Sequence, residues 1–281
     1  MEEIGAIGFI LLLLTSLASY KGFRDQSFFD QYAFHVDPIL RDKDYTRMIS
    51  SGFLHGSWMH LIFNMIALTS FSYEIEQQFG VLTFAVLYFV ALLGGNFLAL
   101  YIHRNHGDYR AIGASGAISG VVFSFAILHP YSQISFILIP IHFTTWIFAL
   151  LYIIISIFGI KTQKGNIGHE AHLGGAIAGM LITIALRPSV VSAHPWIIAV
   201  LLGPCLLFLY LIFKNPNFML LENYWGEGFE SIKSRVKTMN TPKQINPEDE
   251  LDYLLDKIKR KGINSLSAKE RSRLKELSDL K

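Results

Sequence analysis

The chain has 281 residues, of which 52% are hydrophobic and only 16% charged, and its formal net charge is +2. So apolar a composition excludes an ordinary soluble domain, and so small a net charge predicts no nucleic-acid partner. A single cysteine, Cys205, excludes a disulfide framework and a thiolate metal cluster. We therefore expect an all-α polytopic transmembrane helix bundle that is embedded in a lipid bilayer.

Seven apolar segments are long enough to form membrane-spanning helices. The first, about residues 4–20, lacks the basic start of a signal peptide, and we expect it to be retained as a helix. The others are predicted at about 59–79, 82–102, 114–129, 134–158, 169–187 and 195–213. Between the first two lies a loop, Lys21 to about Ser57, whose five basic and five acidic residues are mixed with aromatic ones. This mixture is typical of a segment that lies at the membrane interface.

The end of the chain is polar, and residues 214–281 hold 14 of the 24 lysines and arginines. Asn246 and Pro247 are typical of a helix start, and Ser267–Glu270 has the pattern of a capping box that opens a second helix. Apolar residues on one face of each helix predict a hairpin over 247–280. The predicted domains are a core over 1–190, an additional transmembrane helix over 191–213 and a soluble tail over 214–281.

The fourth span opens with Gly113-Ala114-Ser115-Gly116, and Gly120 follows one turn later. Glycines beside a serine at a helix start leave its hydroxyl accessible, and its backbone N–H is one of the donors that a helix N-terminus leaves without a partner. The same small residues also allow two membrane helices to approach closely without any chemistry. Taken alone, the stretch favours close packing, so the other polar residues decide whether Ser115 is a nucleophile.

Polar side chains inside membrane spans are costly, and they therefore indicate function. His60 and Asn64 share one face of the second span, and His172 lies near the start of the sixth. The chain crosses the membrane twice between Asn64 and Ser115 and twice more before His172, which places these groups on one side. A serine, a histidine and hydrogen-bond donors at one depth are the components of acyl transfer.

Small residues also make one smooth face of the sixth span: Ala171, Gly175 and Gly179. We expect this face to pack on the fourth span and to bring a nitrogen of His172 within hydrogen-bond reach of the Ser115 hydroxyl. Glu170 projects from another face of the helix, so the sequence predicts a catalytic dyad rather than a triad.

Three motifs, in this order, resemble those of the rhomboid family of intramembrane serine proteases over roughly residues 1–190. They are His55-Gly-Ser-Trp-Met-His60-Leu-Ile-Phe-Asn64, Gly113-Ala-Ser115-Gly116 and Ala171-His172-Leu-Gly-Gly175-Ala-Ile-Ala-Gly179. The resemblance implies a six-helix core plus one C-terminal helix, with Ser115 as nucleophile and His172 as general base. It also implies an oxyanion hole made by His60, Asn64 and the Ser115 N–H.

By the same resemblance, the protein would hydrolyse peptide bonds in or near the transmembrane segments of membrane-protein substrates, without a metal or other cofactor. Because bacterial rhomboids include members with a seventh span and a helical tail, we expect a multi-pass protein of a bacterial cytoplasmic membrane. Thr46 replaces the usual tryptophan before the first-loop Arg47. Ser119 stands where several members carry a tyrosine that stacks on the catalytic histidine, and Phe123, one turn later, is a candidate substitute.

Other interpretations fit the sequence less well. A catalytically inactive rhomboid-like protein that binds transmembrane clients is the main one, although both dyad residues are present. The zinc-protease pattern His-Glu-x-x-His does not fit, because His169–His172 is one residue too short. The nucleophile elbow of α/β-hydrolases fails because Ala117 replaces its second glycine. Histidines near span ends, His103 among them, are expected at the membrane interface.

Membrane orientation is predicted differently by two arguments. The family orientation places the first, third and fifth loops outside, yet those loops hold nearly all basic residues that precede the tail, and Arg187 alone lies on the opposite side. The positive-inside rule would therefore favour the inverted orientation. We follow the family, because the basic residues of the first loop are matched by acidic ones. In either orientation, seven spans place the tail on the side of Ser115.

Overall fold

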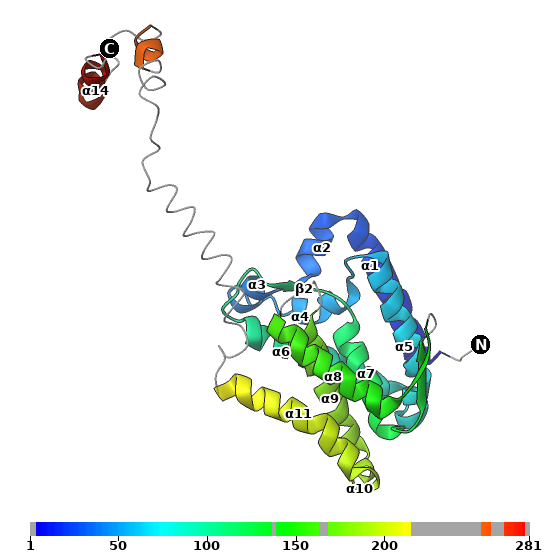
Figure 1. Cartoon of the computed structure of the whole chain (residues 1–281). Coiled ribbons are helices and arrows are strands. Elements are labelled where there is room, and N and C mark those ends of the chain that lie inside the picture. The colour runs from blue at the N-terminus through cyan, green and yellow to red at the C-terminus, as the bar shows by residue number, and fades with distance from the viewer. Residues whose placement is uncertain (1–3, 137–138, 163–167, 215–253, 260–266, 279–281) are drawn as a thin grey trace. The chain divides into compact units, whose positions relative to one another are not determined.

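The computed structural model describes residues 4–136, 139–162, 168–214, 254–259 and 267–278. The chain divides into two compact units, Met1–Asn223 and Tyr224–Lys281, which are described separately. The first unit is a bundle of helices with two short strand pairs (Figure 1). The predicted all-α polytopic fold is confirmed.

The helices of the first unit are α1 (Ala6–Arg24), α2 (Gln26–Tyr32), α3 (Val36–Leu40), α4 (Arg47–Ser50), the 3-10 helix η1 (Ser51–Phe53), α5 (Trp58–Phe79), α6 (Val81–His103), α7 (Ser115–Leu128), α8 (Thr145–Thr162), α9 (His169–Leu186), α10 (Ser189–Ala193) and α11 (Pro195–Lys214). The antiparallel pairs are β1 (Phe34–His35) with β2 (Arg110–Ala111) and β3 (Gln133–Phe136) with β4 (Ile139–Thr144). Among the described residues, α1, α6, α9 and α11 are long and apolar enough to cross a membrane, and α7 and α8 are shorter apolar helices.

The fifth predicted span, 134–158, begins too early. Residues 133–136 and 139–144 form the paired strands β3 and β4, and the helix α8 begins only at Thr145. Pro140 explains the difference, because a proline inside a helix lacks the N–H for the helical hydrogen bond and its ring clashes with the preceding turn. The first span also differs from its prediction, since α1 continues to Arg24.

The first loop is folded rather than irregular and contains four short helices, α2, α3, α4 and η1. Arg47 connects its parts, because its guanidinium donates to the carbonyl oxygens of Asp30 and Ala33 at 2.8 Å each and pairs with Asp44 at 2.8 Å. The Thr46 hydroxyl also donates to the Asp44 carboxylate, and this hydrogen bond, together with Arg47, lowers the pKa of Asp44. Thr46 therefore takes part in holding Arg47 where the family usually has tryptophan.

The centre of the bundle is α9, which packs mainly against α6 and α7. Glycines let the backbones touch: a Cβ atom added at Gly175 would overlap the carbonyl oxygen of Gly116, and one added at Gly179 would overlap that of Gly120. On the opposite side, Gly95 of α6 meets the carbonyl oxygen of Ala171 in the same way. The predicted close packing of the fourth and sixth spans is confirmed.

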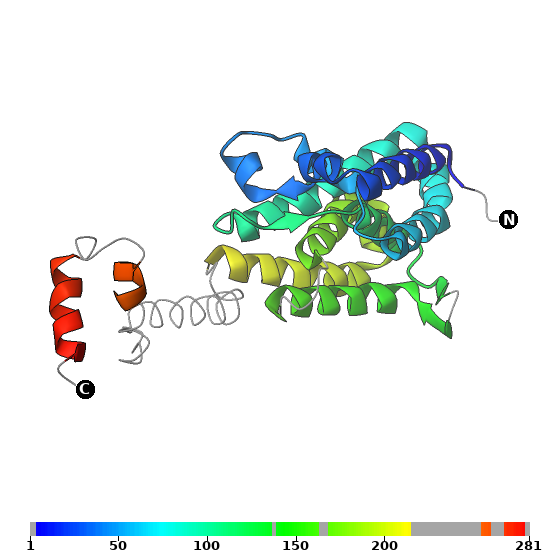
Figure 2. The ribbon, with the colours of Figure 1, turned by 90° about the horizontal axis from the view of Figure 1, so that it is seen from above.

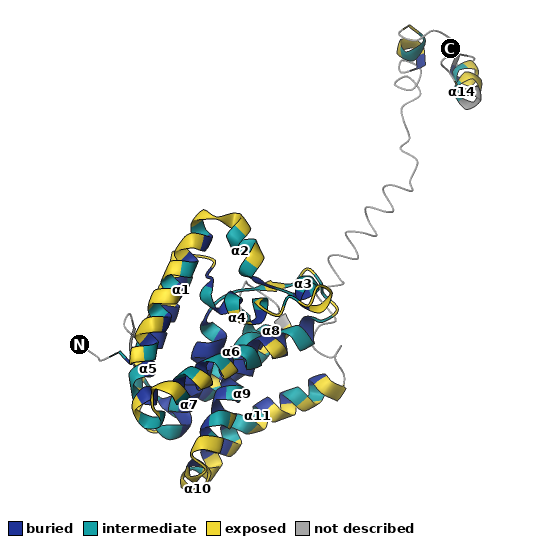
Figure 3. Cartoon of the chain, turned by 180° about the vertical axis from the view of Figure 1, so that it is seen from behind, coloured by how far each residue is buried: buried dark blue, intermediate teal, exposed yellow. Residues whose placement is uncertain are grey.

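The outer surface of the bundle is apolar, as a protein in hydrocarbon requires. Exposed positions, yellow in Figure 3, run along α1 and α11. They include Leu13, Leu14, Leu17, Leu206, Leu207 and Tyr210. Helices α8 and α11 lie side by side along one edge (Figure 2). This surface and the candidate spans identify a multi-pass membrane protein.

The second unit contains a helix over 254–259 and α14 (Ala268–Ser278). Four apolar side chains of these two segments pack together: Leu254, Ile258, Leu274 and Leu277. The predicted capping box is confirmed, because the Ser267 N–H donates to the Glu270 carboxylate at 2.8 Å and the Glu270 N–H donates to the Ser267 hydroxyl at 3.3 Å. The predicted helix start at Asn246 and Pro247 lies outside the described residues. The domain boundaries stay predictions.

We predict that Gly175→Ala lowers the midpoint of thermal unfolding in detergent, because the added methyl group would push α9 away from α7. Overpacking of this kind costs about 1–3 kcal/mol. The matched control is Gly203→Ala on α11, where an added Cβ has no neighbour within 4 Å, and its midpoint should not fall. Equal midpoints for the two variants would contradict the packing described above.

Candidate active site

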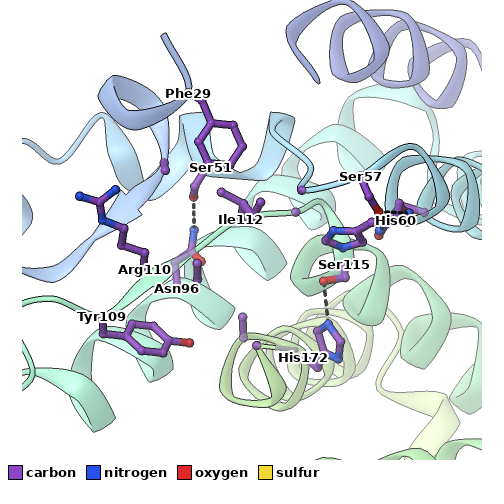
Figure 4. A pocket seen from close by; sticks show the side chains of 17 residues that line it. Phe29, Ser51, Ser57, His60, Asn96, Tyr109, Arg110, Ile112, Ser115 and His172 are labelled. Carbon is purple, nitrogen blue, oxygen red and sulfur yellow. Dashed lines mark hydrogen bonds between the residues drawn. The ribbon is translucent and has the colours of Figure 1, made fainter. Parts of the chain in front are cut away.

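A cavity of about 910 Å³ lies inside the first unit, among α5, α7, α9 and the segment that follows β2 (Figure 4). All four side chains that the sequence singled out line it: His60, Asn64, Ser115 and His172. They come from three helices and from positions up to 112 residues apart along the chain. This arrangement agrees with the number of membrane crossings in the sequence, which predicted that these groups lie on one side of the membrane.

Ser115 is the first residue of α7, so its backbone N–H is among those that the helix does not use. Two residues before it, Gly113 has a φ of 121°, a conformation that other residues rarely adopt. Space also requires glycine here, because an added Cβ would lie 2.9 Å from Cε1 of His60 and 3.7 Å from the Ser115 hydroxyl oxygen. Gly113 therefore leaves room for the His60 ring at the wall of the cavity.

His172 lies in the first turn of α9, and its Nε2 is 2.7 Å from the Oγ of Ser115 (Figure 4). This is a full hydrogen bond, short enough for proton transfer between the two atoms. The glycine contacts between α7 and α9 bring the two side chains together from positions 57 residues apart. The expected contact between the fourth and sixth spans therefore includes the two groups of the predicted dyad.

His60 lies in the first turn of α5, where the Ser57 hydroxyl caps the helix by accepting from the His60 N–H at 3.2 Å. The His55 ring packs edge-on against the His60 ring, with 4.7 Å between their centroids. His55 in turn is fixed by a 2.9 Å hydrogen bond between its Nδ1 and the Ser19 hydroxyl of α1. The His60 ring is therefore held beside Ser115 by contacts that reach back to the first helix.

Asn64 is buried one turn after His60, and its side-chain amide donates to the His60 carbonyl oxygen at 2.9 Å. A primary amide carries two N–H bonds, so the second remains able to donate into the cavity. Asn64, Ser115 and His60 thus line the same cavity.

Glu170 faces away from His172, as the helix position predicts. Its carboxylate meets Nε2 of His103 at 3.0 Å, and the Tyr109 hydroxyl donates to it at 3.5 Å. His103, which was expected at the membrane interface, is the last residue of α6, and its side chain is buried and stacks on the Tyr109 ring with 3.6 Å between centroids. The Glu170 carboxylate on α9 is the hydrogen-bond partner that offsets the cost of burying this histidine. This cluster connects the start of α9 to the end of α6.

Sequence reasoning missed one aromatic residue at the site, Tyr152 of α8. Its ring lies against His172, with 5.8 Å between centroids and 31° between planes. Phe123, the substitute suggested by the sequence, packs edge-on against Tyr152 at 5.6 Å. The one signal in the sequence was Ser119, which replaces the tyrosine that stacks on the catalytic histidine in several rhomboids. A ring in that role would therefore have to come from another position. The evenly apolar fifth span gave no periodicity with which to choose it.

Comparisons with known proteins identify the family of the chain. A family model described as Rhomboid domain matches residues 42–189, and one described as Family of unknown function (DUF6576) matches residues 239–279. Rhomboid protein 1, mitochondrial, of Saccharomyces cerevisiae is 31% identical over 150 residues, which are 51% of this chain and 43% of that protein.

Two further relatives are similar over comparable lengths. RHOMBOID-like protein 5 of Arabidopsis thaliana is 28% identical over 56% of this chain and 50% of its own. Presenilin-associated rhomboid-like protein, mitochondrial, of Rattus norvegicus is 33% identical over 47% of this chain and 36% of its own. The chain thus spans half or less of the length of these relatives. Because the rhomboid model covers just over half of the chain, the protein belongs to the rhomboid family of membrane proteins.

Proposed function

We propose that this protein is an intramembrane serine endopeptidase that cleaves peptide bonds in or near the transmembrane segments of membrane-protein substrates. The observation that carries the proposal is the 2.7 Å hydrogen bond between His172 Nε2 and Ser115 Oγ at the wall of a cavity. A serine hydroxyl is a weak nucleophile unless a base accepts its proton, and a histidine in this position is such a base.

The proposed reaction has two halves. In the first, Ser115 Oγ attacks the substrate carbonyl carbon while His172 takes the hydroxyl proton, and the same proton then passes to the leaving amine as the peptide bond breaks. In the second, His172 takes a proton from water, the hydroxide attacks the acyl-enzyme, and the ester bond to Ser115 breaks with return of the proton to Oγ. The products are two peptide fragments, and the dyad is regenerated.

Negative charge develops on the substrate oxygen in both halves, and three N–H groups are proposed to stabilise it. They belong to the His60 ring, the Asn64 amide and the Ser115 backbone. The N-terminus of α7 adds the positive end of a helix dipole at the same place. The cavity, which is lined in part by polar side chains, also gives water a place inside the bundle, which the second half of the reaction requires.

We further propose that the protein works in a bacterial cytoplasmic membrane. The support is the resemblance to bacterial rhomboids with an additional span and a helical tail, here α11 and the second unit. Two of the relatives named above are mitochondrial, so membrane fractionation of the source cells tests this assignment directly.

We predict that Ser115→Ala and His172→Ala each abolish cleavage of a model transmembrane substrate by the purified protein, because each removes one half of the dyad. Wild type and a variant outside the cavity, Gly203→Ala, are the controls. If the wild type bound the substrate without cleaving it, the client-binding alternative would replace the protease.

Asn64→Ala should give a graded loss. Removing one oxyanion donor typically lowers turnover by about 100- to 1000-fold, while substrate binding changes less. The measurement is kcat and KM with the same substrate. An unchanged kcat would remove Asn64 from the oxyanion hole and leave it with a helix-packing role through its hydrogen bond to the His60 carbonyl.

Glu170→Gln tests whether the dyad has a third member. Replacing the acid of a Ser-His-Asp triad by its amide lowers kcat by about 10,000-fold. Here the carboxylate contacts His103 rather than His172, so we expect turnover to fall less than tenfold, within the range of a loosened helix start. A fall in kcat of about 10,000-fold, as in a triad enzyme, would show that Glu170 orients the catalytic histidine.

A further inference from the structure

The His172 ring must be held in one orientation if Nε2 is to remain directed at Ser115. In triad enzymes a carboxylate on the other ring nitrogen does this. Here the nearest carboxylate on the same helix, that of Glu170, is bound to His103 and faces α6. The orientation of His172 therefore has to come from packing against its ring.

Two rings provide that packing. The Tyr152 ring lies against the His172 ring at 5.8 Å with a 31° tilt, and the His169 ring, from α9 itself, meets it edge-on at 6.0 Å. The Tyr152 ring is in turn contacted by Phe123 of α7 at 5.6 Å and by Phe148 of α8 at 6.1 Å. An aromatic ring held on several sides is a rigid surface, and it restricts rotation of the histidine about its side-chain bonds.

The phenol group fixes Tyr152 in a second way. The Ser119 hydroxyl lies 2.7 Å from the Ser115 carbonyl oxygen and 2.6 Å from the Tyr152 hydroxyl. A serine hydroxyl has one proton, and a carbonyl oxygen only accepts, so Ser119 donates to Ser115 and the Tyr152 hydroxyl donates to Ser119. This chain of hydrogen bonds connects the ring that contacts the base to the backbone of the nucleophile.

We propose that Tyr152 is the positioning residue that holds His172 toward Ser115, with Ser119 as its anchor on α7. The inference rests on the proposed function. Among the described residues that line the cavity Tyr152 does not occur, so it acts through His172 rather than on substrate. The side chain at position 119, too small to reach the histidine, serves as the acceptor for a tyrosine from another helix.

The position of α8 affects the orientation of the catalytic base. The nucleophile and the base lie on α7 and α9, which glycine contacts lock together, whereas the positioning ring lies on α8, a helix that packs less extensively on both. A small shift of α8 would withdraw Tyr152 from His172 without separating α7 from α9. The orientation of the base therefore depends on the place of α8.

The experiment compares Tyr152→Ala with Ile153→Ala in the cleavage assay. Ile153 is the next residue of α8 and is fully buried in the hydrophobic core, so its truncation leaves a cavity on α8 while the Tyr152 ring stays on His172. A misplaced catalytic group costs about 100-fold, and we expect Tyr152→Ala to lower kcat by that order with KM unchanged. Ile153→Ala should lower the unfolding midpoint at least as much, yet retain most of its kcat.

Four further variants test the hydroxyl and the ring separately. Tyr152→Phe and Ser119→Ala each remove the same hydrogen bond, so each should lower kcat by about fivefold, and the double variant should be no worse than either. Adding Ser119→Tyr to Tyr152→Ala places a ring one turn after Ser115, where several rhomboids carry one, and it should restore much of the lost kcat.

Equal kcat for Tyr152→Ala and Ile153→Ala, or failure of the ring at position 119 to restore any activity, would overturn the inference while the wild type remained an active protease. An inactive wild type would reject the proposed function and this inference together.

Discussion

The contact on which the rest of the structure depends is that between the backbones of α7 and α9. Two carbonyl oxygens of α7 occupy the space where side chains of Gly175 and Gly179 would otherwise begin. In a membrane the surrounding lipid is as apolar as the helices, so association rests on close van der Waals contact rather than on the hydrophobic effect. The same contact sets the distance between Ser115 and His172, because both residues lie in the first turns of the two helices.

Several polar side chains that are buried in the bundle are matched by a partner from another element. Glu170 meets His103, His55 meets Ser19, and the Asn96 amide donates to the Met48 carbonyl at 2.7 Å. Such pairs offset the cost of taking polar atoms out of water, and they also fix the helices that carry them. The side chains around the cavity are consequently held in place before any substrate arrives.

The sequence predicted those residues of the site that belong to recognisable motifs or that the number of membrane crossings places on one side. The glycines beside Ser115 and those after His172 predicted an accessible nucleophile and close packing of two helices. The number of membrane crossings predicted that His60 and Asn64 lie on the same side as Ser115 and His172. The sequence could not predict Tyr152, because an evenly apolar helix carries no signal for its rotation. It also placed the start of α8 wrongly, since the apolar residues before Thr145 suit a hairpin as well as a span and only Pro140 distinguishes the two.

The central claim is that His172 activates Ser115 as a nucleophile, and covalent labelling tests it without any natural substrate. The purified protein would be treated with a fluorophosphonate, which reacts with activated serines, and the modified residue identified by peptide mass spectrometry. We expect a stoichiometric adduct on Ser115 that is lost in His172→Ala. Labelling of Ser119 or another serine instead, or an undiminished rate of labelling at Ser115 in His172→Ala, would contradict it.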